Sequence, residues 1–360
     1  MKAAVLHQPK TPLRIEEVEL GEPGAGEVLV KLMASGVCHS DWHVVKGDWS
    51  MMPLPGILGH EGAGIVEATG PNVTGVNKGD HVILSWKTSC GLCEMCQKGW
   101  PQVCERSPAP KSKPTVKGTA TRLYPMAGLG TFGEYAIVPA VAAIPIEKDI
   151  PFAQAALVGC GVTTGVGAAI NTANVQPGST CAVFGAGGVG LNVIQGCRIA
   201  GATQIIAVDV LDNKLAMAKE FGATDAVNAA KDDPVAKVRE LTGGAGVHYA
   251  FEAIGTVEKP FVQSILCTRK RGVTVWVGHA PVNTPVTLDA RILFLEKSVI
   301  GSMYGSSRPH VDFPRLLRLY KAGKLRIDEL ITKRMRLGDV NTAFDLLAQG
   351  KVARSVLTFD

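Results

Sequence analysis

The sequence predicts an α/β protein of two domains, one built on a doubly wound parallel sheet and the other rich in β-strands. The chain has 360 residues, which is long for a single hydrophobic core. Short apolar runs separated by Gly and Pro fill the first third, as in a compact barrel-like domain. From about Val162, such runs alternate with longer helical patterns, which is typical of a parallel sheet covered by helices.

Individual elements follow from these patterns. In the first third we expect strands at residues 27–34, 62–69 and 80–86. In the second part we expect strands at 179–184, 205–208, 226–227, 247–252, 273–278 and 299–301, with helices at 191–200, before Gly222 and at 235–241. In the tail we expect helices at 312–321 and 340–349 and a strand at 355–359. We expect the tail as a whole to rejoin the first domain. The predicted domains are residues 1–161, 162–303 and, returning to the first domain, 304–360.

A glycine-rich turn lies between the predicted strand at 179–184 and the helix that follows it. Gly185, Gly187 and Gly190 have the G-x-G-x-x-G spacing, and the next strand delivers Asp209 at its carboxyl end. These glycines would permit a tight turn, a close approach of backbone N–H groups to a pyrophosphate, and close helix packing. Asp209 would bind an adenosine ribose and repel a 2′-phosphate. The motif therefore predicts a Rossmann-type site for NAD rather than a turn without a ligand.

Composition indicates a soluble globular protein. The chain is 46% apolar and 19% charged, and its net charge of +5 comes from scattered basic residues, so we expect no nucleic-acid partner. No apolar run predicts a membrane span, and the first residues are strand-like rather than a signal peptide. Nine cysteines, four of them crowded together, favour metal binding in a cytoplasmic protein over a disulfide framework.

Four cysteines form a compact cluster with the spacing C-x2-C-x2-C-x7-C: Cys90, Cys93, Cys96 and Cys104. Four thiolates so close in sequence can surround one tetrahedral Zn²⁺. An iron–sulfur cluster takes the same ligands, but an electron-transfer role has no evident place beside a dinucleotide site. A closed four-sulfur site leaves no open coordination position, so we expect it to stabilise the fold.

Three further segments carry metal-ligand residues: Cys38-His39-Ser40-Asp41, His60-Glu61 and Cys160. Each segment alone is more commonly a buried cysteine or a hydrogen-bonded core histidine. Two thiols, an imidazole and a dinucleotide motif in one chain raise the odds of a metal centre. Two cysteines and one histidine would leave one coordination position open, as at a catalytic zinc.

Taken together, the motifs resemble those of zinc-dependent medium-chain alcohol dehydrogenases, from the first strand to the last residues. They are residues 36–41, 59–64, the four-cysteine loop, residues 159–165 and the glycine motif. The resemblance implies a GroES-like catalytic domain, a Rossmann domain, NAD, and two Zn²⁺ per chain. It makes Cys38, His60 and Cys160 the catalytic zinc ligands, with Glu61 beside them and Asp41 orienting His60.

The implied chemistry is hydride transfer between an alcohol and NAD. Zinc lowers the pKa of a bound alcohol, and the nicotinamide accepts the hydride. The resemblance implies a proton relay from Ser40, through the cofactor ribose, to His43 at the surface, where a histidine has a suitable pKa. His43 alone would otherwise be interpreted as a solvated loop histidine.

Further cofactor contacts are implied by the resemblance. Thr164 and Val189 would contact the nicotinamide, Lys214 the adenosine ribose, and His39 and Arg354 the pyrophosphate. The remaining expected contacts are Gly188, Ile254, Val277 and His279. Many relatives have arginine where this chain has His39, so we expect weaker and more pH-dependent cofactor binding, which His39→Arg would tighten.

The positions that line the substrate pocket in the family hold Trp49, Trp86, Phe132 and Met303. Their aromatic rings favour aromatic or medium-chain primary alcohols and aldehydes, although ordinary core packing would explain them equally well. Trp49 and the segment after Cys104 lack the charges expected for a glutathione adduct. The length of the segment 105–130 favours a homodimer, with a tetramer as the alternative.

Two other functions remain open from the residues. A polyol or amino-alcohol dehydrogenase of the same superfamily would have more polar pocket positions than Trp86 and Phe132. A dinucleotide-binding zinc protein without turnover would need neither Ser40 nor His43.

Overall fold

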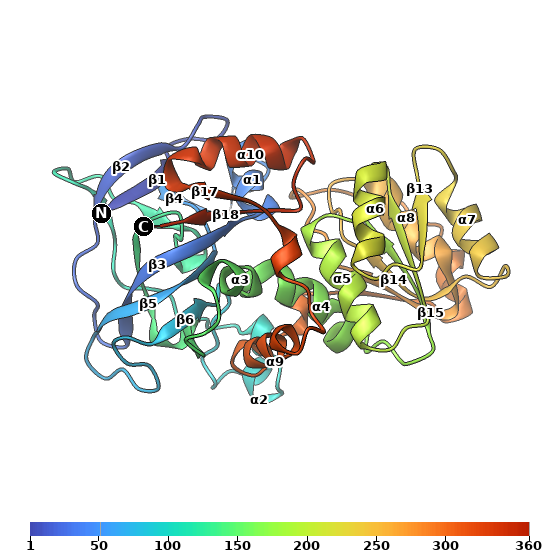
Figure 1. The fold of residues 1–360 in the computed structure, drawn as a ribbon, viewed down its shortest axis with the longest axis horizontal. Helices are drawn as coiled ribbons and strands as arrows, with labels where there is room; N and C mark the ends of the chain where they lie inside the picture. The colour runs from blue at the N-terminus through green and yellow to red at the C-terminus, as the bar shows by residue number, and fades with distance from the viewer. Residues whose placement is uncertain (51, 360) are drawn as a thin grey trace. The chain divides into compact units, whose positions relative to one another are not determined.

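The chain forms two compact units in the computed structural model, which describes residues 1–50 and 52–359 (Figure 1). The first unit contains residues 1–160, 308–323 and 327 onward, and the second contains residues 161–307 and 324–326. The second boundary lies at Ser307 rather than at the predicted Met303. The reason is a close backbone contact, because a Cβ added to Gly167 would lie 2.4 Å from the carbonyl oxygen of Gly305.

Two sheets make up the first unit within the described residues. One has the strand order β7-β2-β1-β4-β8, and the other has the order β10-β6-β5-β3-β18-β17 with β9 also paired to β3. The strands are β1 Lys2–Leu6, β2 Arg14–Glu19, β3 Glu27–Val37, β4 Gly56–Ile57, β5 Glu61–Thr69, β6 His81–Leu84, β7 Thr115–Val116, β8 Tyr124–Pro125, β9 Tyr135–Pro139, β10 Ala143–Ile146, β17 Ile331–Arg336 and β18 Arg354–Thr358. Val28, Val30 and Leu32 of β3 are fully buried, as the alternating sequence pattern predicts.

The tail of the chain returns to the first unit through β18. This strand pairs antiparallel with the end of β3, with Ser355 opposite Val37 and Val356 opposite Gly36. The helices of this unit are α1 His39–Lys46, α2 Glu94–Gln97, α3 Phe152–Leu157, α9 Pro309–Lys321 and α10 Val340–Ala348. Phe344 of α10 packs in the same core cluster as Phe132 and Leu58.

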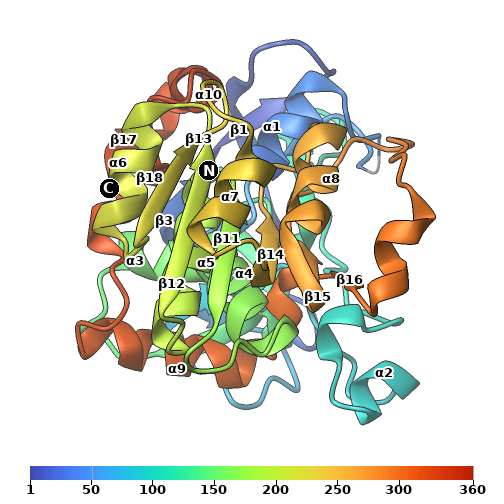
Figure 2. The ribbon, with the colours of Figure 1, turned by 90° about the vertical axis from the view of Figure 1, so that its right-hand side faces the viewer.

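A six-stranded parallel sheet forms the second unit, in the order β13-β12-β11-β14-β15-β16 (Figure 2). The strands are β11 Thr180–Phe184, β12 Gln204–Asp209, β13 Asp225–Asn228, β14 Val247–Glu252, β15 Thr268–Trp276 and β16 Ser298–Gly301. The helices are α4 Thr163–Gly167, α5 Gly188–Ile199, α6 Asp212–Glu220, α7 Pro234–Leu241 and α8 Glu258–Cys267. Right-handed crossovers place α5 and α6 on one face and α7 and α8 on the other. This architecture confirms the predicted fold class.

One helical stretch, Phe152–Thr172, is long and apolar enough to cross a membrane by length and composition. However, 89% of its most apolar window is buried inside the protein. Such burial is typical of a core helix.

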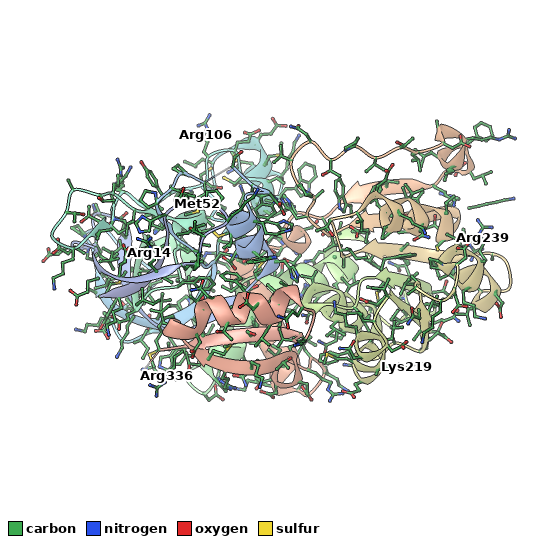
Figure 3. All side chains as sticks on the ribbon, turned by 90° about the horizontal axis from the view of Figure 1, so that it is seen from above. Arg14, Met52, Arg106, Lys219, Arg239 and Arg336 are labelled. Carbon is green, nitrogen blue, oxygen red and sulfur yellow. The ribbon has the colours of Figure 1, made fainter. Side chains whose placement is uncertain are left out.

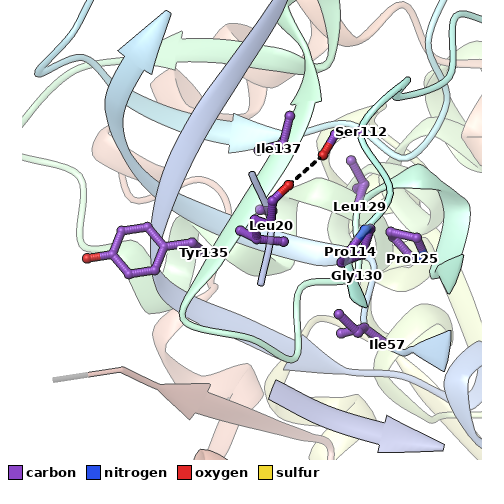
Figure 4. Close-up of a pocket in the computed structure, with 10 residues that line it drawn as sticks. Leu20, Ile57, Ser112, Pro114, Pro125, Leu129, Gly130, Tyr135 and Ile137 are labelled. Atoms are coloured by element: carbon purple, nitrogen blue, oxygen red, sulfur yellow. Dashed lines mark hydrogen bonds between the residues drawn. The ribbon is translucent and has the colours of Figure 1, made fainter. Parts of the chain in front are cut away.

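Basic side chains lie on separate elements of the surface. Arg14, Arg106, Lys219, Arg239 and Arg336, which are labelled in Figure 3, are all exposed and belong to five different segments of the chain. The first unit also contains a small hollow between Leu20, Ile57 and Pro125, where Ser112 Oγ donates a hydrogen bond to the Leu20 carbonyl at 3.0 Å (Figure 4). Since its volume is about 10 Å³, the hollow has room for about one water molecule.

We predict that Gly190→Ala destabilises the protein. A Cβ at this position would lie 1.8 Å from the Gly185 carbonyl oxygen, so α5 must move away from the end of β11. We expect a loss of about 1–3 kcal/mol in the free energy of unfolding. Gly187→Ala is the matched control, because its Cβ would meet nothing within 4 Å. Urea denaturation measures both variants, and equal stability of the two would contradict the prediction.

Candidate metal and cofactor sites

The four clustered cysteines lie on the loop that follows β6 and carries α2. Their sulfur atoms are all within 4.8 Å of one another. Backbone N–H groups donate to these sulfurs: Cys93 N–H to Cys90 Sγ at 3.3 Å and Cys90 N–H to Cys104 Sγ at 3.4 Å. The backbone N–H groups of Cys96 and Glu105 lower the pKa of the Cys93 thiol to about 6. Such donors stabilise thiolates, so the loop fits the closed four-sulfur zinc site that the spacing predicted.

A second cluster brings together Cys38, His60, Glu61 and Cys160. Their ligand atoms also lie within 4.8 Å of one another, and all of the side chains are buried. Cys38 follows β3 directly and His60 precedes β5, so strand pairing aligns the two. Cys160 comes from a π-helical turn, Val158–Val162, inside the long apolar helix. Single π turns of this kind commonly occur at functional sites.

Asp41 organises this second cluster from within the first turn of α1. Its carboxylate is fully buried and accepts hydrogen bonds from Cys38 N–H at 3.1 Å and Gly59 N–H at 2.9 Å. It also lies 3.2 Å from Nδ1 of His60. Burial alone would lower the pKa of His60, but the Asp41 carboxylate raises it. An Nδ1–H held by Asp41 leaves Nε2 of His60 as the nitrogen that can bind a metal.

Glu61 and Arg354 form a buried ion pair next to the same cluster. Nη2 of Arg354 donates a hydrogen bond to Glu61 Oε2, and the side chains of Arg354 and Glu61 are 5% and 0% exposed. Burial raises the pKa of Glu61 to about 7, although the attraction to Arg354 opposes the rise. The structure therefore places the Arg354 guanidinium at the cysteine–histidine cluster. Its contact with a pyrophosphate remains a prediction.

The two thiols of the second cluster interact with each other. A hydrogen bond with Cys160 holds the pKa of Cys38 well below its ordinary value, and the same bond raises the pKa of Cys160. A buried set of two sulfurs, one imidazole and one carboxylate has the donors that zinc prefers, so the residues fit a catalytic zinc.

The position of His43 corrects one prediction. We expected it at the surface, but its residue is 4% exposed, because its ring stacks on Trp49 with centroids 4.8 Å apart. Gly47, with φ of 80°, ends α1 and turns the chain back, so that Asp48 lies 2.8 Å from His43 Nδ1. The Asp48 side chain is 24% exposed and also pairs with Lys46 Nζ at 2.6 Å. Asp48 and Lys46 are therefore the solvent-facing members of the group that they form with His43. Asp48 was not predicted as a site residue, because the sequence shows there only an acidic residue directly after a glycine.

The four predicted pocket residues occupy different surroundings. The Trp86 ring lies edge-on to His60, with centroids 6.5 Å apart. Trp49 is buried against His43, and Met303 of the second unit is 42% exposed. Phe132 has no exposed surface and packs edge-on against Phe344 in the core. The alternative of ordinary core packing therefore fits Phe132, and its role in lining a pocket stays a prediction.

The glycine motif of the second unit forms an open cradle at the amino end of α5. Gly185 has φ of 90°, a Cβ at Gly187 would meet nothing within 4 Å, and no side chain of the described residues caps α5. The first N–H groups of α5 are thus available to an anion such as a pyrophosphate. Asp209, at the end of β12, is 8% exposed and accepts hydrogen bonds from Ala186 N–H and Val210 N–H, each at 2.8 Å. The residues fit a dinucleotide.

Most of the remaining predicted cofactor residues lie at the carboxyl edge of the parallel sheet or on the helices that begin there. Gly188 and Val189 begin α5, and Lys214 lies on α6. Ile254 follows β14, and Val277 and His279 follow β15. Thr164 lies on α4, whereas His39 is exposed at the start of α1 in the first unit. Carboxyl edges of parallel sheets are where ligands bind in such folds.

We predict about two zinc ions per purified chain, and about one in either Cys93→Ser or Cys38→Ser, because each variant removes a ligand from a different cluster. Cys267→Ala is the matched control, since Cys267 is a buried thiol outside both clusters and should retain both ions. Elemental analysis after gel filtration measures the content. Loss of both ions in one variant, or of neither, would contradict independent sites.

Comparisons with known proteins extend over both units. The alcohol dehydrogenase GroES-like domain model matches residues 24–148, and the zinc-binding dehydrogenase model matches residues 188–322.

Three solved structures resemble the chain over nearly its full length. An alcohol dehydrogenase zinc-binding domain protein from Burkholderia ambifaria is 35% identical, with coverage of 100% of this chain and 98% of the other and a TM-score of 0.93. Benzyl alcohol dehydrogenase from Acinetobacter calcoaceticus is 33% identical, with coverage of 100% and 99% and a TM-score of 0.92. A zinc-binding dehydrogenase from Sinorhizobium meliloti bound to NADP is 27% identical, with coverage of 99% of each chain and a TM-score of 0.82. The chain therefore belongs to the zinc-binding medium-chain alcohol dehydrogenase family.

Proposed function

We propose that the chain is an NAD-dependent zinc alcohol dehydrogenase that interconverts primary alcohols and aldehydes of aromatic or medium-chain type. The observation that carries the proposal is the buried cluster of Cys38, His60 and Cys160, with Trp86 edge-on to the histidine. Two sulfurs and one imidazole leave a position for a substrate oxygen, as at a catalytic zinc.

Each residue of the cluster has a role in this proposal. Cys38, His60 and Cys160 hold the metal, and Asp41 keeps the His60 ring in its orientation. Zinc would act there as a Lewis acid toward the alcohol oxygen. Bound NAD would accept the hydride. Ser40, next to Cys38 in the turn, and the His43–Asp48 pair are the polar groups proposed to move the alcohol proton.

The substrate class rests on the apolar rings near the first-unit cluster. Trp86 presents its edge to His60, and Trp49 covers His43, so alcohols with flat or extended apolar groups are favoured over polyols. The likeness to a benzyl alcohol dehydrogenase at 33% identity supports the same class.

The preference for NAD rests on Asp209. Its buried carboxylate lies at the end of β12, where it would accept hydrogen bonds from ribose hydroxyls and repel a 2′-phosphate. One related dehydrogenase was solved with NADP, so activity measured with both dinucleotides tests the role proposed for Asp209.

We further propose a cytoplasmic homodimer. The edge strand β16 and the turn before it expose apolar side chains, including Phe294 at 85%, Leu293 at 39% and Val299 at 37%. A second copy could cover this edge, and β16 is a terminal strand of the sheet among the described residues. Within the described residues no disulfide joins any of the cysteines, and six of the nine belong to the two metal clusters, as expected in a reducing compartment. A sedimentation mass of one chain would contradict the dimer.

The first experiment measures NADH formation from benzyl alcohol, 1-hexanol, ethanol, sorbitol and threonine, with NAD and with NADP. We expect turnover of benzyl alcohol or hexanol with NAD, and its loss in Cys38→Ser. Activity confined to sorbitol or threonine would move the substrate to the polyol or amino-alcohol class. A zinc-loaded protein that binds NADH without any turnover would contradict an enzymatic function.

We predict that His43→Gln lowers turnover more at low pH than at high pH. An acceptor for the alcohol proton is most needed when hydroxide is scarce, so we expect a loss of roughly tenfold or more on the acid side. His7→Gln is the control, because His7 pairs with Glu16 away from the cluster. Parallel pH–rate profiles of His43→Gln and the unmodified enzyme would show that His43 takes no part in proton transfer.

A further inference from the structure

Glu252 is a buried carboxyl group at the end of β14 that no step of the proposed chemistry uses. The residue is 1% exposed and lies within the second unit. Its oxygen Oε2 has no hydrogen-bond partner among the described residues. A buried and partly unsatisfied acid is unfavourable, so its presence calls for a specific role.

The carboxyl group of Glu252 holds the loop that follows its own strand. Its Oε1 accepts hydrogen bonds from Ile254 N–H at 2.8 Å and Gly255 N–H at 2.9 Å. Two bonds to one oxygen fix the turn in which the chain leaves β14. This turn presents Ile254, one of the predicted cofactor contacts.

The main-chain carbonyl of Glu252 holds the neighbouring loop. It accepts hydrogen bonds from Val277 N–H at 2.9 Å and Gly278 N–H at 2.8 Å, just past the end of β15. One residue thereby joins the loops after two adjacent strands. Val277 and His279, also predicted cofactor contacts, lie on this second loop.

The two loops are in direct contact around the Glu252 side chain. A Cβ added to Gly278 would lie 2.3 Å from the Gly255 nitrogen and 2.6 Å from Glu252 Oε2. A Cβ added to Gly255 would lie 2.3 Å from the nitrogen of His279. Only glycine on both loops permits this approach, so the loops have one packed arrangement and little room to shift.

We propose that Glu252 is a positioning residue that holds the β14 and β15 loops in the arrangement that binds the dinucleotide. This inference rests on the proposed function, because it assigns the cofactor to the carboxyl edge of the sheet. Glu252 does not touch the reacting atoms in this proposal. It raises affinity by keeping the loops in the binding-competent state, which otherwise would be populated only part of the time.

The environment of the Glu252 carboxyl group suggests a conservative variant. Burial raises the pKa of Glu252, although the two N–H donors from Gly255 and Ile254 oppose the rise. Glutamine has the same length and keeps one oxygen for these N–H groups. Glu252→Gln should therefore retain loop positioning, whereas the shorter Glu252→Asp and the truncated Glu252→Ala should lose it.

The test measures the Kd of NADH by titration calorimetry for the zinc-loaded protein. We expect Glu252→Ala and Glu252→Asp to raise Kd on the order of tenfold, and Glu252→Gln to stay within about threefold of the unmodified protein. Gly278→Ala disturbs the same contact from the other loop and should also weaken binding. In turnover assays, the KM for NAD should rise while kcat at saturating NAD is retained.

Hydrogen exchange without cofactor gives a readout that does not depend on activity. We expect faster exchange in peptides covering residues 253–257 and 277–280 of Glu252→Ala. The matched control is Val247→Ala at the opposite end of β14, where Val247 is fully buried. It should lower stability with the NADH Kd and the exchange of both loops unchanged.

The outcomes separate this inference from the proposed function. An unmodified protein that does not bind NADH would overturn both. An unmodified protein that binds NADH, with Glu252→Ala or Glu252→Asp folded and binding equally well, would overturn the positioning role alone. The same conclusion would follow if these variants lost only stability, as expected for Val247→Ala.

Discussion

The antiparallel ladder that joins β5, β3 and β18 is the constraint on which the candidate metal centre depends. In this ladder Gly36 pairs with Glu61, and Val37 pairs with Ser355. A Cβ at Gly36 would lie 2.0 Å from Glu61 Oε2, so the absence of a side chain there is required for the carboxylate to fit. Hydrogen-bonded strand ends, rather than mobile loops, therefore set the positions of Cys38, His60 and Arg354. Sites built on such elements hold their geometry well.

Charged side chains are buried on this ladder and on the helix α1 that follows β3. Asp41 and Glu61 are fully buried, and Arg354 is 4% exposed. Removing charges from water is unfavourable, and ion pairs recover that free energy only when their remaining atoms also find partners. Each of these charged side chains prefers water to a buried position. The pairing of the surrounding strands must therefore supply the free energy that keeps them buried. Residues held against their own preference in this way are expected at functional sites.

Local signals explain which features could be predicted from the sequence. The glycine motif, the four-cysteine loop and the apolar parallel strands each carry their pattern within a few residues. β14, for example, lies at the predicted residues 247–252 because its buried run has clear ends. By contrast, β17 was not predicted, because Thr332, Lys333 and Arg334 are exposed and polar. It is the terminal strand beside β18 within the described sheet, where charged residues are typical.

Features created by tertiary contacts could not be predicted. The π turn at Cys160 forms where a helix brings the Cys160 thiol beside Cys38, after β3, and His60, before β5. The burial of His43 depends on Trp49 and on the return of the chain after Gly47. The roles of Glu252 depend on a loop that follows a different strand. In each case the residue type is visible in the sequence, but its partner lies where only the folded chain brings it.

The discontinuity of the first unit has a consequence for the order of folding. The second unit is almost contiguous, at residues 161–307, so its sheet can assemble from segments that are close in sequence. The first unit also needs β18, Arg354–Thr358, which pairs with the end of β3 although most of the second unit separates the two strands in sequence. Closing so long a loop costs chain entropy, so we expect the ladder that carries Cys38, His60 and Arg354 to form late in folding. The residues that fit the catalytic metal would then come together only when the first unit closes.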